Sequence, residues 1–276
     1  MALAKKLQAA RQAAGLTQQQ LCQKAGLSYS TLAKIERGAI KAPSIFTIQS
    51  IATAVGTSLD TLVGHESAGG QVAKKTSKSG IKFVYFDING CLVRFFHRAF
   101  TRIAEDTGVP LDMVESAMWH YNDAACRGEM SMDELNKVLA QKLNVPSVDW
   151  ASYYLDAVDP IDEMHEFVKW AAEHYRIGLL SNIMPGVIDS LLKRGLIPDA
   201  DYTAVIDSSE VGAIKPEEKI YEIAEEKAGA KPNEILLVDD DRNNLMAAEH
   251  KGWRVMWFDD FRPKESVDRV KEVLEF

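Results

Sequence analysis

Residues 81–93 read IKFVYFDINGCLV, an apolar run followed by an acidic, glycine-containing turn. Because the run is short and rich in β-branched and aromatic residues, it predicts a strand buried on both faces, as in a parallel sheet. Similar runs recur at Ile177–Leu180, Ala204–Ile206, Ile235–Val238 and Val255–Phe258. Helical patterns separate most of these runs, so the sequence predicts an α/β fold with a doubly wound, Rossmann-like parallel sheet.

Two stretches interrupt this alternation and divide the chain. Residues from about 95 to 160 carry long helical patterns without a convincing strand, which indicates a helical insertion. Residues 65–80 read HESAGGQVAKKTSKSG, which is rich in Gly, Ser and Lys and has no apolar period, as expected of a flexible linker. We therefore expect an all-α domain at residues 1–64, the linker at 65–80 and an α/β domain at 81–276.

The charge is unevenly distributed along the chain. Residues 1–80 contain ten basic and three acidic residues, a net charge of +7, whereas the remainder contains 22 basic and 37 acidic residues, a net charge of −15. A basic N-terminal part on an acidic body indicates a polyanionic partner. Lys74, Lys75 and Lys78 could instead solvate the linker, but the segment keeps a charge of +4 without them.

The composition excludes several classes of protein. The chain is 46% hydrophobic and 26% charged, so it can bury a core and is not disordered by composition. No apolar run approaches the roughly 20 residues of a membrane helix, and residues 1–20 do not resemble a signal peptide. The three scattered cysteines predict reduced thiols rather than a zinc site or disulfides. We therefore expect a cytoplasmic protein that contacts no membrane.

The N-terminal residues contain two short helical patterns joined by a turn at Gly26. Thr17 is a good N-cap with Gln20 at capping-box spacing, and Ser28 can begin the next helix. Two helices joined in this way predict a helix-turn-helix unit. The stretch GLTQQQLCQKAGLSYSTLAKIERG at residues 15–38 resembles the Xre/Cro-type helix-turn-helix of phage repressors, and the resemblance extends over residues 3–64.

This resemblance implies that the helix beginning at Tyr29 enters the major groove of a double-stranded DNA operator. It assigns base-edge contacts to Tyr29, Ser30 and Lys34, and phosphate contacts to Gln18, Ser28, Arg37 and Lys41. It also implies a buried ion pair between Arg11 and Glu36, and a homodimer, because family members bind inverted repeats as dimers. Tyr29 could equally be an exposed aromatic residue without a role.

Polar residues follow the predicted strands at the edge where open α/β sheets bind ligands. They are Asp87 and Asn89, then Ser181 and Asn182, then Lys215, then Asp239, Asp240, Asp241 and Asn244. Phosphoryl transfer to an aspartate needs a nucleophilic carboxylate, a hydrogen-bond donor, a cation and carboxylates that hold Mg²⁺. Three like charges in one turn also repel each other unless a cation relieves them. The four groups, in this order over residues 81–276, resemble the haloacid dehalogenase (HAD) superfamily.

The HAD resemblance implies a role for each group. Asp87 is the expected nucleophile, Ser181 donates to the phosphoryl group, and Lys215 neutralises charge on both. The expected Mg²⁺ ligands are Asp87, Asp240 and the backbone carbonyl of Asn89, with support from Asp239 and Asn244. Asn182 is expected beside Ser181 and Lys215 in the binding site for a small phosphorylated metabolite.

The insertion at about residues 95–160 corresponds to the small helical cap of this superfamily. Its stretch RGEMS, residues 127–131, resembles a turn in the caps of sugar phosphatases and of the N-domains of epoxide hydrolases. Such a cap closes over the site and selects small substrates. The candidates for substrate contact are His120, Tyr121, Asn122 and Arg127, which could equally be cap surface.

Asn89 departs from the usual HAD phosphatase pattern, in which an aspartate protonates the leaving oxygen and then activates water. An asparagine has nearly the same shape but exchanges no proton at neutral pH. Three interpretations stay open: a slow phosphatase, a sensor that binds a phosphorylated metabolite without turnover, or an asparagine introduced as a trap. The sequence therefore predicts a DNA-binding regulator fused to an Mg²⁺-dependent phosphohydrolase domain, with a non-catalytic sensor domain as the alternative.

Overall fold

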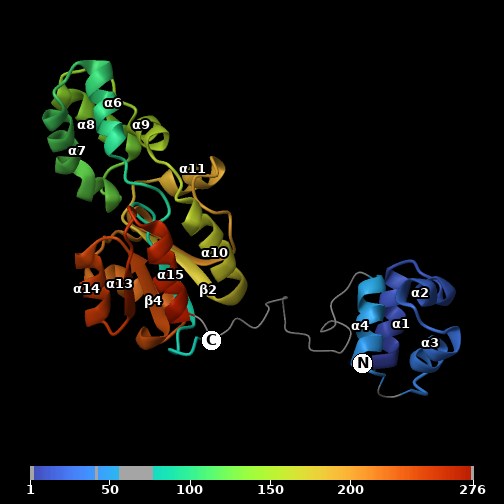
Figure 1. The fold of residues 1–276 in the computed structure, drawn as a ribbon. Helices are drawn as coiled ribbons and strands as arrows, with labels where there is room; N and C mark the ends of the chain where they lie inside the picture. Colours follow the sequence, from blue (N-terminus) through green and yellow to red (C-terminus); the bar gives the residue numbers. More distant parts are fainter. Residues whose placement is uncertain (1–2, 41–42, 56–76, 275–276) are drawn as a thin grey trace. The chain divides into compact units, whose positions relative to one another are not determined.

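The computed structural model describes residues 3–40, 43–55 and 77–274, and the chain forms two compact units, 1–72 and 73–276 (Figure 1). The first unit contains four helices in its described part: α1 (Leu3–Ala13), α2 (Gln18–Ala25), α3 (Tyr29–Glu36) and α4 (Ile45–Val55). Lys41 and residues 65–76 of the expected linker lie outside the described residues.

Local signals in the sequence set the ends of α2 and α3. The Thr17 side chain accepts from the backbone of Gln20, whose own side chain accepts from the backbone of Thr17, so the expected capping box is confirmed. Gly26 ends α2 in the left-handed conformation, and Ser28 caps α3. The helices pack on a small apolar core that includes Leu7, Leu21, Leu32, Ile35 and Ile51.

The second unit is built on a five-stranded parallel sheet in the order β3-β2-β1-β4-β5. The strands are β1 (Phe83–Phe86), β2 (Arg176–Ser181), β3 (Tyr202–Asp207), β4 (Ile235–Asp239) and β5 (Arg254–Trp257). Each lies where an apolar run predicted it, so the α/β fold with a doubly wound sheet is confirmed. Because the chain order reverses at β1, the carboxyl end of β1 is the topological switch point, where such sheets bind ligands.

Helices cover both faces of this sheet (Figure 1). Val84 and Phe86 of β1 point to a face covered by α10 (Asp162–His174) and α15 (Pro263–Leu274). Phe83 and Tyr85 point to the opposite face, which is covered by α13 (Glu218–Ala228) and α14 (Arg242–His250). The remaining short elements are α11 (Val187–Lys193), α12 (Ser208–Val211) and the 3-10 turn η1 (Pro232–Glu234). Covering both faces buries β1 completely, so it holds the loop that follows it rigidly.

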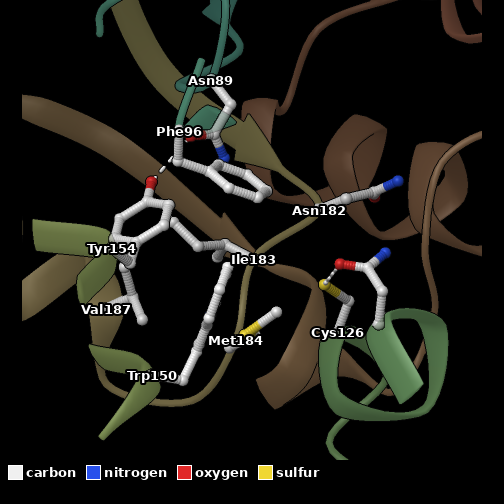
Figure 2. Close-up of a pocket in the computed structure, with 10 residues that line it drawn as sticks. Asn89, Phe96, Cys126, Trp150, Tyr154, Asn182, Ile183, Met184 and Val187 are labelled. Atoms are coloured by element: carbon white, nitrogen blue, oxygen red, sulfur yellow. Dashed lines mark hydrogen bonds between the residues drawn. The ribbon is translucent and has the colours of Figure 1, made fainter. Parts of the chain in front are cut away.

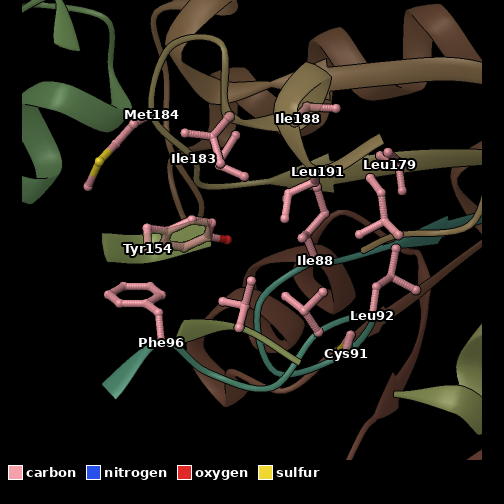
Figure 3. Close-up of a cluster of buried hydrophobic side chains, with 14 of the residues drawn as sticks. Ile88, Cys91, Leu92, Phe96, Tyr154, Leu179, Ile183, Met184, Ile188 and Leu191 are labelled. Carbon is pink, nitrogen blue, oxygen red and sulfur yellow. The ribbon is translucent and has the colours of Figure 1, made fainter. Parts of the chain in front are cut away.

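Between β1 and α10 the chain forms four helices without a strand, as the sequence predicts for residues 95–160. These cap helices are α6 (His97–Thr107), α7 (Leu111–Cys126), α8 (Met132–Leu143) and α9 (Trp150–Ala157). Their apolar side chains join those of the sheet in one cluster, of which Figure 3 shows the part around Phe96, Tyr154 and Ile183. None of the described helices is long and apolar enough to cross a bilayer.

Candidate functional site

The polar residues expected at the strand ends come together at the carboxyl edge of the sheet. Strand register brings Phe86 level with Val238 of β4, so Asp87 and Asp239 follow side by side. Gly90 lets the loop after β1 approach β4 closely, because a Cβ at this position would lie 2.2 Å from Oδ2 of Asp240. The backbone of Gly90 also has a φ of +79°, which an L side chain rarely adopts.

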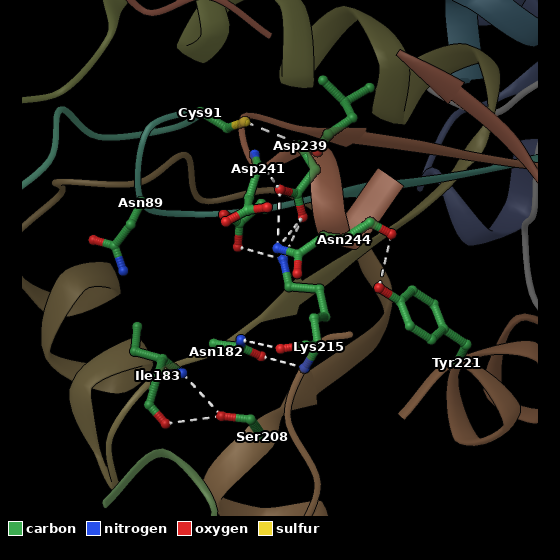
Figure 4. Close-up of polar contacts among 12 residues, drawn as sticks. Asn89, Cys91, Asn182, Ile183, Ser208, Lys215, Tyr221, Asp239, Asp241 and Asn244 are labelled. Atoms are coloured by element: carbon green, nitrogen blue, oxygen red, sulfur yellow. Dashed lines mark hydrogen bonds and ion pairs between the residues drawn. The ribbon is translucent and has the colours of Figure 1, made fainter. Parts of the chain in front are cut away.

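Lys215 is the cation of this site, and it is buried between two carboxylates (Figure 4). Its Nζ lies 2.5 Å from Oδ2 of Asp239 and 2.9 Å from Oδ1 of Asp87. The other oxygen of Asp239 accepts from the backbone N–H of Asp241 and from the side-chain amide of Asn244. Asp239 therefore holds Lys215 in place, and Asn244 orients Asp239.

Asp87 and Asp240 have raised pKa values because they are buried close to other carboxylates. Burial raises the pKa of Asp87 to about 6, against the lowering effect of Lys215. Burial and the neighbouring Asp87 and Asp239 raise the pKa of Asp240 to about 8. Burial disfavours the charged form of Lys215, but Asp239 and Asp87 outweigh this effect and raise its pKa. One lysine therefore does not balance the negative charge of three carboxylates.

This cluster could hold a metal ion. Three carboxylate oxygens, one each from Asp87, Asp239 and Asp240, lie within 4.8 Å of one another. Mg²⁺ prefers carboxylate and carbonyl oxygens, and a divalent cation would relieve the repulsion that raises the pKa of Asp240. Since both oxygens of Asp239 already have protein partners, Asp87 and Asp240 are the carboxylates best placed to hold the ion.

The raised pKa of Asp240 predicts a stability that depends on both pH and metal. Without metal, its contribution is full below the ordinary pKa of 3.8 and is lost as the pH rises through about 8, because the folded protein holds the proton more tightly. In a chelator, the melting temperature should therefore fall between about pH 5 and about pH 8, whereas Mg²⁺ should raise it most at the higher pH. Thermal unfolding with and without Mg²⁺ tests this, and a melting temperature that rises across this range in chelator contradicts it.

Ser181 ends β2 beside the carboxylate of Asp87, and this contact lowers the pKa of Asp87. The residue is fully buried, and its Oγ has no further hydrogen-bond partner within the described part of the chain. The hydroxyl can therefore donate to a ligand oxygen held near Asp87 and Lys215.

Asn89 lies apart from the Lys215 contacts in Figure 4, and a cap residue holds it. The Tyr154 hydroxyl of α9 donates to Oδ1 of Asn89 at a distance of 2.7 Å. Tyr154 is buried, and burial raises its pKa, so it stays protonated as the donor. The sequence analysis missed Tyr154, because no motif marks it and only the packing of α9 brings it to this loop.

A small cavity of about 20 Å³ lies between the sheet and the cap, with Asn89 and Asn182 in its lining (Figure 2). Asn182 is fixed at its edge, because its amide group exchanges two hydrogen bonds with the backbone of Lys215. Asn122 of α7 also lines the cavity, whereas His120 is exposed and is not among its described lining residues. Of these two cap candidates, the structure brings only Asn122 to the cavity.

Arg127 does not line the cavity either, and the structure shows a different role for it. Its guanidinium donates to Oε1 of Glu217, at 2.9 Å from Nε and 2.6 Å from a terminal nitrogen. The next residue, Gly128, passes close to α12, because a Cβ there would approach the backbone oxygen of Ser209 to 2.1 Å. Arg127 and Gly128 therefore join the cap to the sheet domain.

In the N-terminal unit, α3 presents the side chains expected to meet DNA. Tyr29, Ser30, Lys34 and Arg37 are all exposed. Two of the expected phosphate contacts have partners within the unit: the Gln18 amide donates to Glu36 at 2.7 Å, and the Ser28 hydroxyl caps α3.

The expected Arg11–Glu36 pair is confirmed, with Nε of Arg11 2.7 Å from Oε1 of Glu36, and it is buried. A bidentate guanidinium–carboxylate pair with good geometry fixes α1 against α3. The packing of α1 against α3 thus depends on this ion pair. Gln18 of α2 also donates a hydrogen bond to Glu36.

Comparison with known protein families supports both halves of this description. Residues 81–252 match the family model of haloacid dehalogenase-like hydrolases, and residues 7–62 match a helix-turn-helix family. No curated protein sequence matches the chain significantly.

Several solved structures share the fold of the second unit. A HAD family enzyme from Bacteroides thetaiotaomicron, in complex with magnesium and inorganic phosphate, is 19% identical with a TM-score of 0.52, covering 66% of this chain and 96% of its own. A protein from Porphyromonas gingivalis described as a predicted HAD-like family hydrolase is 21% identical with a TM-score of 0.58, covering 69% of this chain and 97% of its own. The L-2-haloacid dehalogenase from Xanthobacter autotrophicus, with chloropropionic acid covalently bound, is 20% identical with a TM-score of 0.51, covering 64% and 77%.

Proposed function

We propose that this chain, which belongs to the haloacid dehalogenase-like hydrolases, hydrolyses a small phosphate monoester with Mg²⁺ and carries a DNA-binding regulatory domain at its N-terminus. The observation that carries the hydrolase proposal is the buried Lys215, held between Asp87 and Asp239 at the switch point of the sheet. In this proposal Asp87 is the nucleophile, Lys215 is a fixed positive charge and Ser181 is a hydroxyl donor beside Asp87.

In the first step, a carboxylate oxygen of Asp87 attacks phosphorus while the bond from phosphorus to the ester oxygen breaks. The electron pair of that bond stays on the leaving oxygen, and the phosphoryl group remains on Asp87 as an acyl phosphate. Lys215 and the Ser181 hydroxyl are placed to stabilise the phosphoryl oxygens. When bound, Mg²⁺ would supply further charge neutralisation from Asp87 and Asp240.

In the second step, water attacks the phosphorus of the acyl phosphate, which releases inorganic phosphate and restores the Asp87 carboxylate. Both steps normally need a proton carrier: an acid for the leaving oxygen and a base for the water. Asn89 occupies that position and carries no exchangeable acid proton. We therefore expect slow turnover, and fastest turnover on esters whose leaving oxygen is only weakly basic.

The test of this function is phosphate release by the full-length protein and by Asp87→Asn, which keeps the shape of the side chain. We expect Mg²⁺-dependent release by the wild type and its loss in the variant, because the amide is not a nucleophile. Release is measured as inorganic phosphate from a panel of phosphate monoesters. Release that persists in Asp87→Asn overturns the assignment of Asp87.

Asn89 favours a second candidate, in which the domain is a sensor. In this proposal the site binds a phosphorylated metabolite without hydrolysis and controls the DNA-binding domain. The same panel separates the two candidates: binding of an ester without Asp87-dependent release supports the sensor. Release above background by the wild type rules out the purely non-catalytic version.

For the N-terminal domain we propose that a homodimer binds double-stranded operator DNA in the cytoplasm, with Tyr29, Ser30, Lys34, Arg37 and Lys41 as the contacts. The exposed polar face of α3 and the match to a helix-turn-helix family support this proposal. The three free, buried thiols are compatible with a reducing compartment.

Replacing Lys34 with alanine is expected to weaken binding to the protein's own promoter DNA by about tenfold or more, because one base contact worth about 1–3 kcal/mol is lost. The matched control is Lys5→Ala, which removes the same charge from the exposed surface of α1 and should change affinity less. Fluorescence anisotropy at several salt concentrations measures both. The DNA proposal is wrong if the wild type shows no salt-dependent binding.

A further inference from the structure

We infer that Arg127 of the cap is a positioning residue for Lys215, and that it acts through Glu217 without touching a ligand. This inference rests on the proposed function, in which Lys215 stabilises the phosphoryl oxygens. It goes further than that function, because it makes a residue of the cap responsible for the placement of the cation in the sheet domain.

Lys215 lies in a turn that Ile214 and Glu217 close. The backbone N–H of Glu217 donates to the carbonyl oxygen of Ile214 at 2.8 Å, and the backbone N–H of Ile214 donates to Oε2 of Glu217 at 3.2 Å. Ile214 is buried, so its N–H needs a protein acceptor, and the Glu217 side chain supplies it. The shape of the turn around Lys215 therefore depends on where the Glu217 carboxylate lies.

Asn182 holds the same turn from the sheet (Figure 4). Its Oδ1 accepts from the backbone N–H of Lys215 at 2.6 Å, and its amide donates to the carbonyl oxygen of Lys215 at 2.8 Å. Asn182 directly follows β2, so these two bonds fix the backbone of Lys215 to a strand end. Asn182 and Glu217 together determine the direction in which the Lys215 side chain leaves the backbone.

The cap reaches this turn through Arg127. Oε1 of Glu217 accepts from Nε of Arg127 at 2.9 Å and from a terminal nitrogen at 2.6 Å, whereas Oε2 accepts from Ile214. The hydrogen bond from Arg127 lowers the pKa of Glu217, so the carboxylate stays charged. A guanidinium that donates twice to one oxygen restricts the carboxylate, and this keeps the other oxygen at the Ile214 N–H.

The backbone beside Arg127 is seated on the sheet domain. A Cβ at Gly128 would lie 2.1 Å from the backbone oxygen of Ser209 in α12, so only a glycine permits this approach. The neighbouring Ser208 hydroxyl bonds to the backbone N–H and carbonyl of Ile183, the residue after Asn182. Arg127 therefore starts from a place that is fixed relative to the Lys215 turn.

A second ion pair between cap and sheet domain provides a matched control. Arg194 of α11 lies 2.6 Å from Oδ1 of Asp156 in α9, and their side chains are 47% and 50% exposed, compared with 29% and 40% for Arg127 and Glu217. Neither side chain of this second pair bonds to residues 214–217 within the described part of the chain. Ion pairs this exposed contribute little to stability, so loss of either pair should leave the fold intact.

The test measures amide hydrogen exchange of residues 214–217 in the full-length protein. We expect exchange about tenfold faster in Arg127→Ala, because the Glu217 carboxylate loses its restraint, and no change in Arg194→Ala. Glu217→Ala should have the same effect, and adding Arg127→Ala to it should change nothing further, since the two residues act in series. Arg127→Lys should recover part of the protection.

The same variants are then assayed for phosphate release with Mg²⁺. We expect kcat/KM to be about 10- to 100-fold lower in Arg127→Ala and unchanged in Arg194→Ala, because a small displacement of a group at the reacting centre is costly. Faster exchange in both variants, or in neither, overturns the inference. Unchanged phosphate release in Arg127→Ala also overturns it and leaves the hydrolase proposal intact.

A wild type that releases no phosphate from any ester contradicts the hydrolase proposal, and phosphate affinity then replaces release as the second measurement. Calorimetry with inorganic phosphate and Mg²⁺ is done on the wild type, Arg127→Ala and Arg194→Ala. Weaker binding by Arg127→Ala alone, together with its faster exchange, supports the inference. Equal binding by all three, or no binding by the wild type, overturns it.

Discussion

Replacing Asn89 with aspartate is expected to raise kcat for phosphate-ester hydrolysis by about 10²–10⁴-fold. The reason is that a positioned general acid and base contributes this much to proton-transfer steps, and the amide contributes none. The site can accept the change without rearrangement, because Asp and Asn have nearly the same shape and the Tyr154 hydroxyl can donate to either. Phosphate release from esters with strongly and weakly basic leaving oxygens measures the gain, which should be largest for the strongly basic ones.

Tyr154 provides the matched control for this prediction. Tyr154→Phe removes the hydrogen bond to residue 89 and keeps the ring in the cap. In the Asn89→Asp background it should remove part of the gain and shift the acid limb of the pH–rate profile, because the carboxyl loses its donor. No gain from Asn89→Asp at any pH means that proton transfer at this position does not limit turnover.

Replacing Lys215 with methionine is expected to lower the free energy of unfolding of the second unit by about 3–5 kcal/mol at neutral pH without metal. This is the usual cost of removing one partner of a buried charge pair, because Asp87 and Asp239 would stay buried without their cation. Urea denaturation followed by tryptophan fluorescence measures it, since all five tryptophans lie in residues 81–276.

The pH dependence distinguishes this effect from a simple packing defect. Without Lys215 the pKa of Asp87 rises further, so the loss of stability should shrink as the pH falls toward about 5. Lys219→Met is the matched control, because Lys219 is exposed and its loss should change stability by about 0.5 kcal/mol or less. A loss that is constant over this pH range would contradict the electrostatic explanation.

The sequence predicted the sheet and the strand-end residues because both depend on local patterns. Apolar runs marked the strands, and the carboxyl ends of parallel strands meet at one edge, so Asp87, Ser181 and Asp239 had to lie close together. The capping box at Thr17 is equally local, and the structure confirms it.

The parts that the sequence did not predict all depend on how the cap packs. Tyr154 meets Asn89 across 65 positions, and Arg127 meets Glu217 across 90. Neither contact leaves a periodic signal, since each requires two domains to be docked before the side chains can meet. His120 was a reasonable candidate by residue type, but the orientation of α7 exposes it and turns Asn122 to the cavity instead.

The hydrogen bond from Tyr154 to Asn89 links cap helix α9 to the loop after β1, which carries Asp87 and Asn89. Exchanging the cap for that of another hydrolase would therefore also remove the only side chain of the described residues that bonds to Asn89. A chimaera of this kind needs a hydroxyl donor grafted at the position of Tyr154, or it changes reactivity together with substrate choice. The same coupling constrains the evolution of this protein. A substitution of Tyr154 that alters substrate contacts also alters the hydrogen bond to Asn89.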